Sequence, residues 1–254
     1  HYRDLANKPF EFHSTSNTGI ETNTNSALGD HTFAMGRMTS AEGFAATSTG
    51  FLTKAMGDYS FSSGLSSQAN GEASFSSGKL TVANGDFATA LGEGSQANAK
   101  TAFASGENSS ATADHATALG LGTTASGARS VATGSGSEAS GTSATAMGSA
   151  TEAIGNYSFA AGQNSRAQGN HATAIGFATM AMGASSFAAG EGSAAESNHS
   201  IAMGNYAHAS NSGAIALGEY TNATGAYAMA MGDGANAEGD SSVAIGTGAS
   251  AYGE

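Results

Sequence analysis

Small, large apolar and polar residues follow one another along this chain in an order that returns every fourteen residues. The repeat is visible in GDYSFSSGLSSQAN (57–70), which is followed directly by GEASFSSGKLTVAN (71–84). From Gly29 the chain divides into sixteen ungapped units of this length, the last of which ends at Tyr252. Glycine occupies position eight and alanine position thirteen of every unit. Self-similarity at a fixed period indicates a repeat architecture, and it has to be recognised before individual elements are assigned.

The small residues within a unit predict two strands joined by two corners. Positions four, six, eleven and thirteen carry only Ala, Ser or Thr, at a spacing of two that is typical of a strand. Glycine near every seventh residue provides backbone that turns tightly or takes a positive φ, and the predicted turn glycines include Gly64, Gly78, Gly92, Gly106 and Gly120. Fourteen residues are too few for a repeat that contains a helix. We therefore predict an all-β parallel β-solenoid of about sixteen turns.

The bulky apolar side chains stand at positions five and seven, which must face away from the narrow interior. Along a solenoid they form an apolar stripe larger than the patches that soluble monomers usually expose. A turn with small Thr89 and large Leu91 is followed by a turn with large Phe103 and small Ser105. Such complementary layers fill a core without voids, so we predict burial against other copies of the chain. The predicted core residues are Leu91, Phe103, Leu119, Met147, Phe159, Ile175, Phe187, Ile201, Met203, Ile215, Leu217, Val243 and Ile245.

The repeat resembles the YadA-like head of the trimeric autotransporter adhesins of Gram-negative bacteria. The likeness rests on the segments SVAIG (242–246), AIALG (214–218) and SIAMG (200–204), joined by G-x-x-S-x-A-x spacers, and it covers residues 29–252. The resemblance implies a left-handed parallel β-roll that assembles as a parallel homotrimer, with positions five and seven toward the threefold axis. It also implies an extracellular head that binds a matrix protein or a cell-surface glycan, held at the bacterial surface by an outer-membrane anchor of the parent protein.

Residues 1–28 lack the repeat, and we interpret them as a cap or linker that precedes the β-roll head at 29–254. A cap would shield the first turn from edge pairing. The segment YRDL (2–5), followed by NKPF (7–10), is similar to a segment of phage and prophage tail-fibre proteins, which use comparable repeats. A tail-fibre shaft or receptor-binding segment of a virion, and a structural spacer, are therefore alternatives to the adhesin head.

Charge and composition exclude several classes of function. The net charge of −12, with no cluster of Lys and Arg, lacks the electrostatic signature of a nucleic-acid-binding protein. Without cysteine the chain has no disulfides, thiolate metal ligands or thiol nucleophiles. No apolar run approaches the roughly eighteen residues of a membrane span. Contact with a membrane is therefore expected only through a C-terminal anchor outside this chain.

Polar residues at the corners do not predict a metal or catalytic site. Asp and Glu recur at position two, and we interpret them as solvated corners because they lack the spacing of a calcium-binding β-roll. Serine is so frequent that no Ser-His-acid constellation stands out, and a small-residue interior provides no deep pocket. Four histidines share position three, but the nearest two lie two turns, about 10 Å, apart, which is too far to share an ion. The four histidines are His31, His115, His171 and His199. We expect no cofactor, no metal and no enzymatic activity.

Two tyrosines are the candidate ligand-binding residues. Tyr206 and Tyr220 share position ten on adjacent turns, so their rings are predicted to stack on one edge of the surface, about 4.8 Å apart. Exposed aromatic rings can mark a carbohydrate or protein contact.

Overall fold

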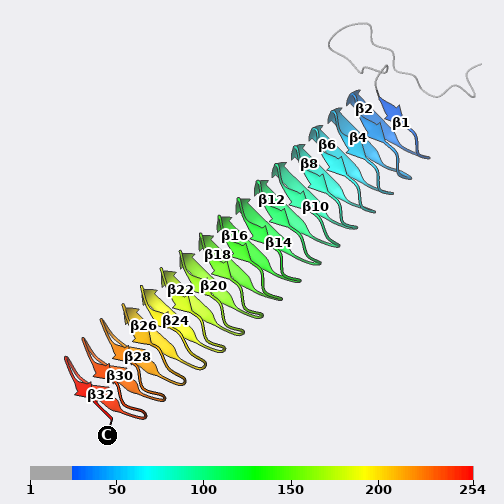
Figure 1. The fold of residues 1–254 in the computed structure, drawn as a ribbon. Helices are drawn as coiled ribbons and strands as arrows, with labels where there is room; N and C mark the ends of the chain where they lie inside the picture. The colour runs from blue at the N-terminus through cyan, green and yellow to red at the C-terminus, as the bar shows by residue number, and fades with distance from the viewer. Residues whose placement is uncertain (1–24, 254) are drawn as a thin grey trace, which may run out of the picture. The chain divides into compact units, whose positions relative to one another are not determined.

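The computed structural model describes residues 25–253, which form successive turns of β-strand (Figure 1). The chain comprises two units, 1–107 and 108–254. The predicted cap falls, for residues 1–24, outside the described residues. Its remaining part contains the first strand, β1 (Ser26–Ala27), which pairs in parallel with β3 (Ser40–Ala41) of the next turn.

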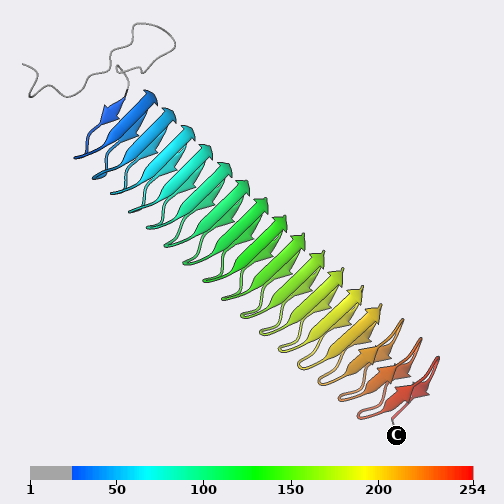
Figure 2. The ribbon, with the colours of Figure 1, turned by 180° about the vertical axis from the view of Figure 1, so that it is seen from behind.

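Each turn of the first unit contains one long and one short strand. The long strands span positions five to nine and are β2 (Phe33–Arg37), β4 (Thr47–Phe51), β6 (Phe61–Leu65), β8 (Phe75–Lys79), β10 (Thr89–Glu93) and β12 (Phe103–Glu107). The short strands span positions twelve and thirteen and, after β1 and β3, are β5 (Lys54–Ala55), β7 (Gln68–Ala69), β9 (Val82–Ala83) and β11 (Gln96–Ala97). The ribbon seen from behind shows the long strands running in one direction (Figure 2).

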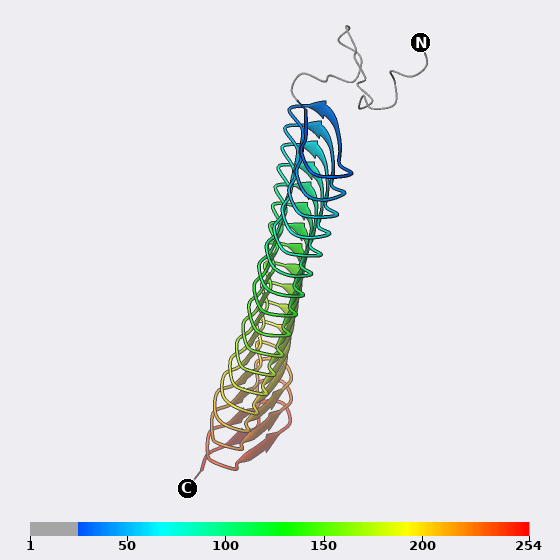
Figure 3. The same cartoon turned by 90° about the vertical axis from the view of Figure 1, so that its right-hand side faces the viewer.

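The second unit repeats this pattern. Its long strands are β14 (Thr117–Leu121), β16 (Val131–Ser135), β18 (Thr145–Ser149), β20 (Phe159–Gln163), β22 (Thr173–Phe177), β24 (Phe187–Glu191) and β26 (Ile201–Asn205), followed by the three-residue strands β28 (Ile215–Leu217), β30 (Met229–Met231) and β32 (Val243–Ile245). Its short strands are β13 (Ser110–Ala111), β15 (Thr124–Ala125), β17 (Glu138–Ala139), β19 (Glu152–Ala153), β21 (Arg166–Ala167), β23 (Met180–Ala181), β25 (Ala194–Ala195), β27 (His208–Ala209), β29 (Asn222–Ala223), β31 (Asn236–Ala237) and β33 (Ser250–Ala251). Loops carry the chain from long to short strand and back in every turn (Figure 3).

Every strand pairs in parallel with the strand one turn away, in strict fourteen-residue register. Phe159 of β20 lies beside Thr173 of β22, and Glu152 of β19 lies beside Arg166 of β21. Long strands pair with long strands and short strands with short strands within each unit. The predicted parallel β-solenoid, with fourteen residues per turn and about sixteen turns, is confirmed.

The interior between the two strands contains only small side chains. Ala160, Ala167 and Ser165 are fully buried, and the largest fully buried side chains of the described residues are threonines. Interior hydroxyl groups donate to backbone and to one another: Ser165 Oγ donates to the Gly176 carbonyl at 2.9 Å, and Thr179 Oγ1 donates to Ser165 Oγ at 2.9 Å. The prediction that positions four, six, eleven and thirteen face inward is confirmed by their burial.

The predicted turn glycines lie inside strands rather than at corners, which corrects the sequence interpretation. Their φ angles are positive, as expected, but each is the fourth residue of its long strand: Gly64 (107°), Gly78 (139°), Gly92 (101°), Gly106 (128°) and Gly120 (127°). A Cβ atom on Gly64 would overlap the carbonyl oxygen of Gly78 in the next turn. Glycine is required at position eight because two backbones approach closely there.

The corners lie instead at positions three and ten, where the backbone takes the left-handed conformation. Tyr157 (φ 58°) and Asn164 (φ 54°) are two of them. A left-handed residue other than glycine costs about 1–2 kcal/mol. At Tyr157 the backbone N–H donates to the Thr142 carbonyl one turn earlier at 2.8 Å, and hydrogen bonds of this kind between turns offset the strain.

The close approach at position eight predicts that alanine is not tolerated there. We expect Gly162→Ala to lower the free energy of unfolding by about 2–4 kcal/mol, because its Cβ would overlap the Gly176 carbonyl at a positive φ. The matched control is Gly122→Ala, where no atom lies within 4 Å of the added Cβ.

Alanine already occupies the equivalent corner position at Ala150 and Ala178, so the control should cost only about 1 kcal/mol. Chemical denaturation followed by circular dichroism measures both variants. Equal losses of stability in the two variants would contradict the close-approach explanation.

Candidate binding surfaces

The bulky residues at positions five and seven lie on the outer face of the long strands. The predicted core residues Leu91 and Phe103 belong to the first unit, and the other eleven belong to the second. Phe103, Phe159 and Phe187 are half-buried in the single chain. Met203 is 44% exposed and Ile245 65% exposed. Within each unit, no other part of residues 25–253 covers this apolar stripe.

Between Thr145 and Ile175, large and small side chains alternate along this stripe. Strand pairing places Phe159 beside Thr145 on one side and beside Thr173 on the other. At position seven the order is reversed, since Ala161 lies between Met147 and Ile175. Complementary bumps and hollows of this kind are typical of a surface that interdigitates with another surface.

Aromatic rings reinforce the stripe in the first unit. Phe61 and Phe75 stack on adjacent turns with ring centroids 4.9 Å apart and planes 8° apart. Stacked aromatic pairs add stability beyond the area that they bury. Position seven of the same two turns carries Ser63 and Ser77, whose hydroxyl oxygens lie 2.8 Å apart.

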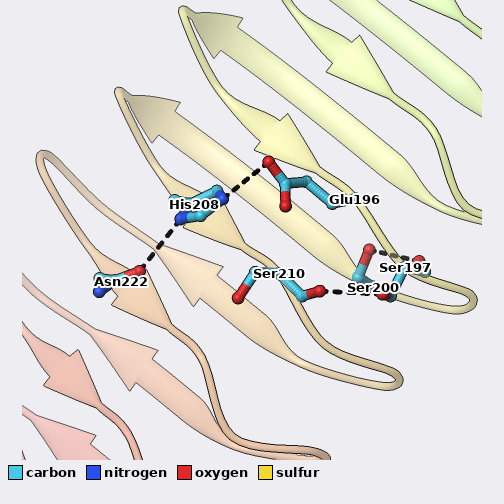
Figure 4. Close-up of polar contacts among 6 residues, drawn as sticks. All are labelled: Glu196, Ser197, Ser200, His208, Ser210 and Asn222. Carbon is cyan, nitrogen blue, oxygen red and sulfur yellow. Dashed lines mark hydrogen bonds and ion pairs between the residues drawn. The ribbon is translucent and has the colours of Figure 1, made fainter.

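The opposite outer face, on the short strands, is polar, and its side chains form hydrogen bonds with one another. In the second unit a chain of contacts runs from Glu196 through His208 to Asn222 (Figure 4). The Glu196 Oε1 to His208 Nε2 distance is 3.0 Å, and the His208 Nδ1 to Asn222 Oδ1 distance is 3.2 Å. Asn222 Nδ2 then donates to Asn236 Oδ1 at 3.2 Å, and Asn236 Nδ2 donates to Glu238 Oε1 at 2.6 Å. This face is suited to contact with water.

Acidic and amide side chains at position two bind the backbone of the preceding turn. Asp58 Oδ1 accepts from the Phe44 N–H at 2.8 Å, and Asp240 Oδ1 accepts from the Ala226 N–H at 2.9 Å. The interpretation of these carboxylates as merely solvated corners was therefore incomplete. They join successive turns, and their fourteen-residue spacing was the signal that could have indicated it.

The salt bridges that the structure describes join exposed side chains. Lys79 and Glu93 lie on adjacent turns with Nζ and Oε1 2.5 Å apart, and both side chains are half exposed. The hydrogen bond that Lys79 donates to the Glu93 carboxylate, together with the negative charge of that carboxylate, raises the pKa of Lys79. Exposed pairs of this kind contribute little to stability.

Two of the histidines at position three pack against aromatic rings. His171 stacks on Tyr157 with ring centroids 5.0 Å apart, and His31 packs edge-on against Phe44 at 5.4 Å. No group of three or more potential ligands is gathered anywhere in residues 25–253. The same part of the chain contains no helix that could cross a bilayer.

The candidate ligand-binding tyrosines do lie together. Tyr206 and Tyr220 stack with ring centroids 5.6 Å apart and planes 2° apart. They are 51% and 59% exposed, respectively. The predicted stacking is confirmed, and it leaves the ring edges and hydroxyl groups at the surface.

Comparison with protein families gives one match. The model of the YadA head domain repeat (2 copies) matches residues 83–109, 97–123, 111–137, 125–151, 139–165, 153–179, 195–220 and 223–249, which together make up more than half of the chain. A search of curated proteins finds no match.

The alternating stripe predicts that charge at position five prevents association between chains. We expect the double variant Phe103→Asp with Phe159→Asp to weaken association by about 3 kcal/mol or more per chain, because each substitution removes a large apolar group and places a charge in its position. Chemical cross-linking followed by denaturing electrophoresis measures the effect.

The control is Gln96→Asp, which adds a carboxylate to the exposed outer face of β11 and should leave cross-linking unchanged. Unchanged cross-linking in the double phenylalanine variant would mean that position five does not lie in an interface.

Proposed function

Because the chain belongs to the YadA head family, we propose that it is the head of a trimeric autotransporter adhesin. The head repeats of this family are structural adhesin domains rather than catalytic ones. Three parallel copies, each a left-handed β-roll, pack along a common axis. The head stands at the surface of a bacterium whose outer membrane anchors the parent protein.

One observation supports this proposal most strongly, namely the apolar stripe on the outer face of the long strands. The stripe, which includes Met203 and Ile245, exposes more apolar surface than a soluble monomer usually does, and its side chains alternate in size between Thr145 and Ile175. Three copies that turn this face to a shared axis bury the stripe and leave the polar short strands outside. The thirteen core residues predicted from sequence are the proposed contacts along that axis.

Attachment in this proposal depends on multivalency. A trimer presents three equivalent outer surfaces, so a ligand with repeated sites binds more tightly than any single contact allows. Extracellular matrix proteins and cell-surface glycans both present repeated sites. The sequence similarity of residues 2–10 to tail-fibre proteins lies outside the described residues, and no structural observation favours that alternative.

The proposal predicts adhesion that depends on assembly. Beads coated with the protein should attach to extracellular matrix or to cultured epithelial cells well above an albumin-coated surface. Beads that carry the same mass of the double variant Phe103→Asp with Phe159→Asp should lose about tenfold or more of this attachment, since avidity is lost with the trimer.

Attachment is counted under flow, and beads coated with the Gln96→Asp variant provide the control. If the unaltered protein attaches to neither matrix nor cells above the albumin level, the chain is not an adhesin head.

A further inference from the structure

The corner of the second unit that carries Tyr206 and Tyr220 has one uncovered aromatic face. On the N-terminal side, a Cβ atom at Gly192 would lie 2.7 Å from Cδ1 of Tyr206, so the Tyr206 ring rests over this glycine. The other face of Tyr206 is covered by the stacked ring of Tyr220. Tyr206 therefore has no free ring face.

Tyr220 differs from Tyr206 because the residue at the same corner of the next turn is a glycine, Gly234. Backbone hydrogen bonds place the turns in order: the Tyr220 N–H donates to the Asn205 carbonyl at 2.8 Å, and the Gly234 N–H donates to the Glu219 carbonyl at 2.8 Å. No atom lies within 4 Å of a Cβ position built on Gly234, and the same holds for Gly248 one turn further. Two side-chain-free corners thus follow Tyr220, and the ring face turned toward them is open to a ligand.

Acidic residues stand next to this corner in the two turns that form it. Glu219 directly precedes Tyr220, Asp233 directly precedes Gly234, and both acidic residues are exposed. Within the described residues neither carboxylate has an ion-pair partner. The surrounding sequence is acidic too, since residues 167–254 contain seven Asp and Glu and no Lys or Arg. A cation is therefore the ligand that this corner attracts electrostatically.

The first unit shows that a guanidinium group fits the spacing between adjacent turns. Arg37 and Phe51 are paired at position nine of neighbouring turns, and the Arg37 guanidinium carbon lies 5.5 Å from the centroid of the Phe51 ring. That contact is made at position nine, the position that directly precedes the corner of Tyr220. An aromatic ring on one turn and a guanidinium one turn away are thus compatible with the backbone of this solenoid.

We propose that the Tyr220 ring face, with Glu219 and Asp233, binds the guanidinium group of an arginine in a basic segment of a partner protein. The planar cation stacks on the ring, and the carboxylates accept its N–H groups. A lysine ammonium group has the charge but lacks the planar stacking and the forked donors. A neutral sugar can stack on the ring but leaves the carboxylates without a charged partner. The inference rests on the proposed adhesin role, to which it adds a class of ligand.

Isothermal titration calorimetry of the assembled protein tests the proposal, with the acetylated and amidated peptide (Gly-Arg)₄ at 0.15 M NaCl. We expect the (Gly-Lys)₄ peptide to bind more weakly than the arginine peptide. Tyr220→Leu should weaken binding of the arginine peptide about 2- to 5-fold, as expected for loss of a cation–π contact at an exposed site. Tyr220→Phe should retain the affinity because it keeps the ring.

Two further variants complete the comparison. Glu219→Gln with Asp233→Asn should also weaken the arginine peptide, and more so at low salt. The matched control is Tyr227→Leu, at a tyrosine that is 70% exposed at position three rather than at this corner, and it should change nothing.

Three results would overturn the inference: no binding of the arginine peptide, equal affinity for the two peptides, or binding that Tyr220→Leu leaves intact. Binding of a neutral oligosaccharide that is lost in Tyr220→Leu would overturn it in favour of a glycan site. Bead attachment by the same variants separates this inference from the proposed function. If beads coated with Tyr220→Leu still attach, only the arginine site is contradicted. If beads coated with the unaltered protein do not attach, the adhesin role is contradicted.

Discussion

The close approach of backbones in successive turns is the constraint on which the rest of this structure depends. At position eight of most turns a glycine lies so near the glycine carbonyl of the next turn that even a Cβ atom would overlap it, as at Gly64 and Gly162. Between the two strands of a turn, the largest fully buried side chains of the described residues are threonines. Such an interior satisfies its backbone through parallel pairing but buries little apolar surface for each residue. Phenylalanine, leucine, isoleucine and methionine cannot be accommodated inside, so they stand on the outer face of the long strands. In the proposed trimer, burial of these side chains against the other copies is then the main hydrophobic contribution to stability.

The outer faces and the corners of the solenoid have different roles. The short strands carry polar ladders, such as Glu196 with His208 and Asn222, whose side chains bind one another along the stack. Carboxylates at position two join turns through the backbone, as Asp58 does. The corners at positions three and ten are free of both demands, and their side chains vary in size from glycine to tyrosine. A repeat that fixes the interior and one face leaves these corners available for recognition, and Tyr220 is the corner at which an open ring and unpaired carboxylates coincide.

The fourteen-residue period predicted the fold class, the inward positions and the stacking of Tyr206 on Tyr220, because each follows from translation by one turn. The location of the corners could not be predicted in the same way. Gly64 was expected at a turn since glycine adopts a positive φ freely, whereas the structure uses glycine for close approach and places residues such as Tyr157 at the left-handed corners. The bonds made by Asp58 were missed because residues one turn apart are distant in sequence. The open face of Tyr220 depends on the absence of a side chain at Gly234, which has meaning only when the turns are stacked.

The native mass of the unaltered protein tests the central claim most directly, because the apolar stripe requires neighbouring copies. Light scattering on a size-exclusion column gives this mass independently of molecular shape. Three copies of the 24.7 kDa chain predict a value of about 74 kDa. A stable monomer of 24.7 kDa would contradict the account, since the stripe would then remain exposed to water without penalty.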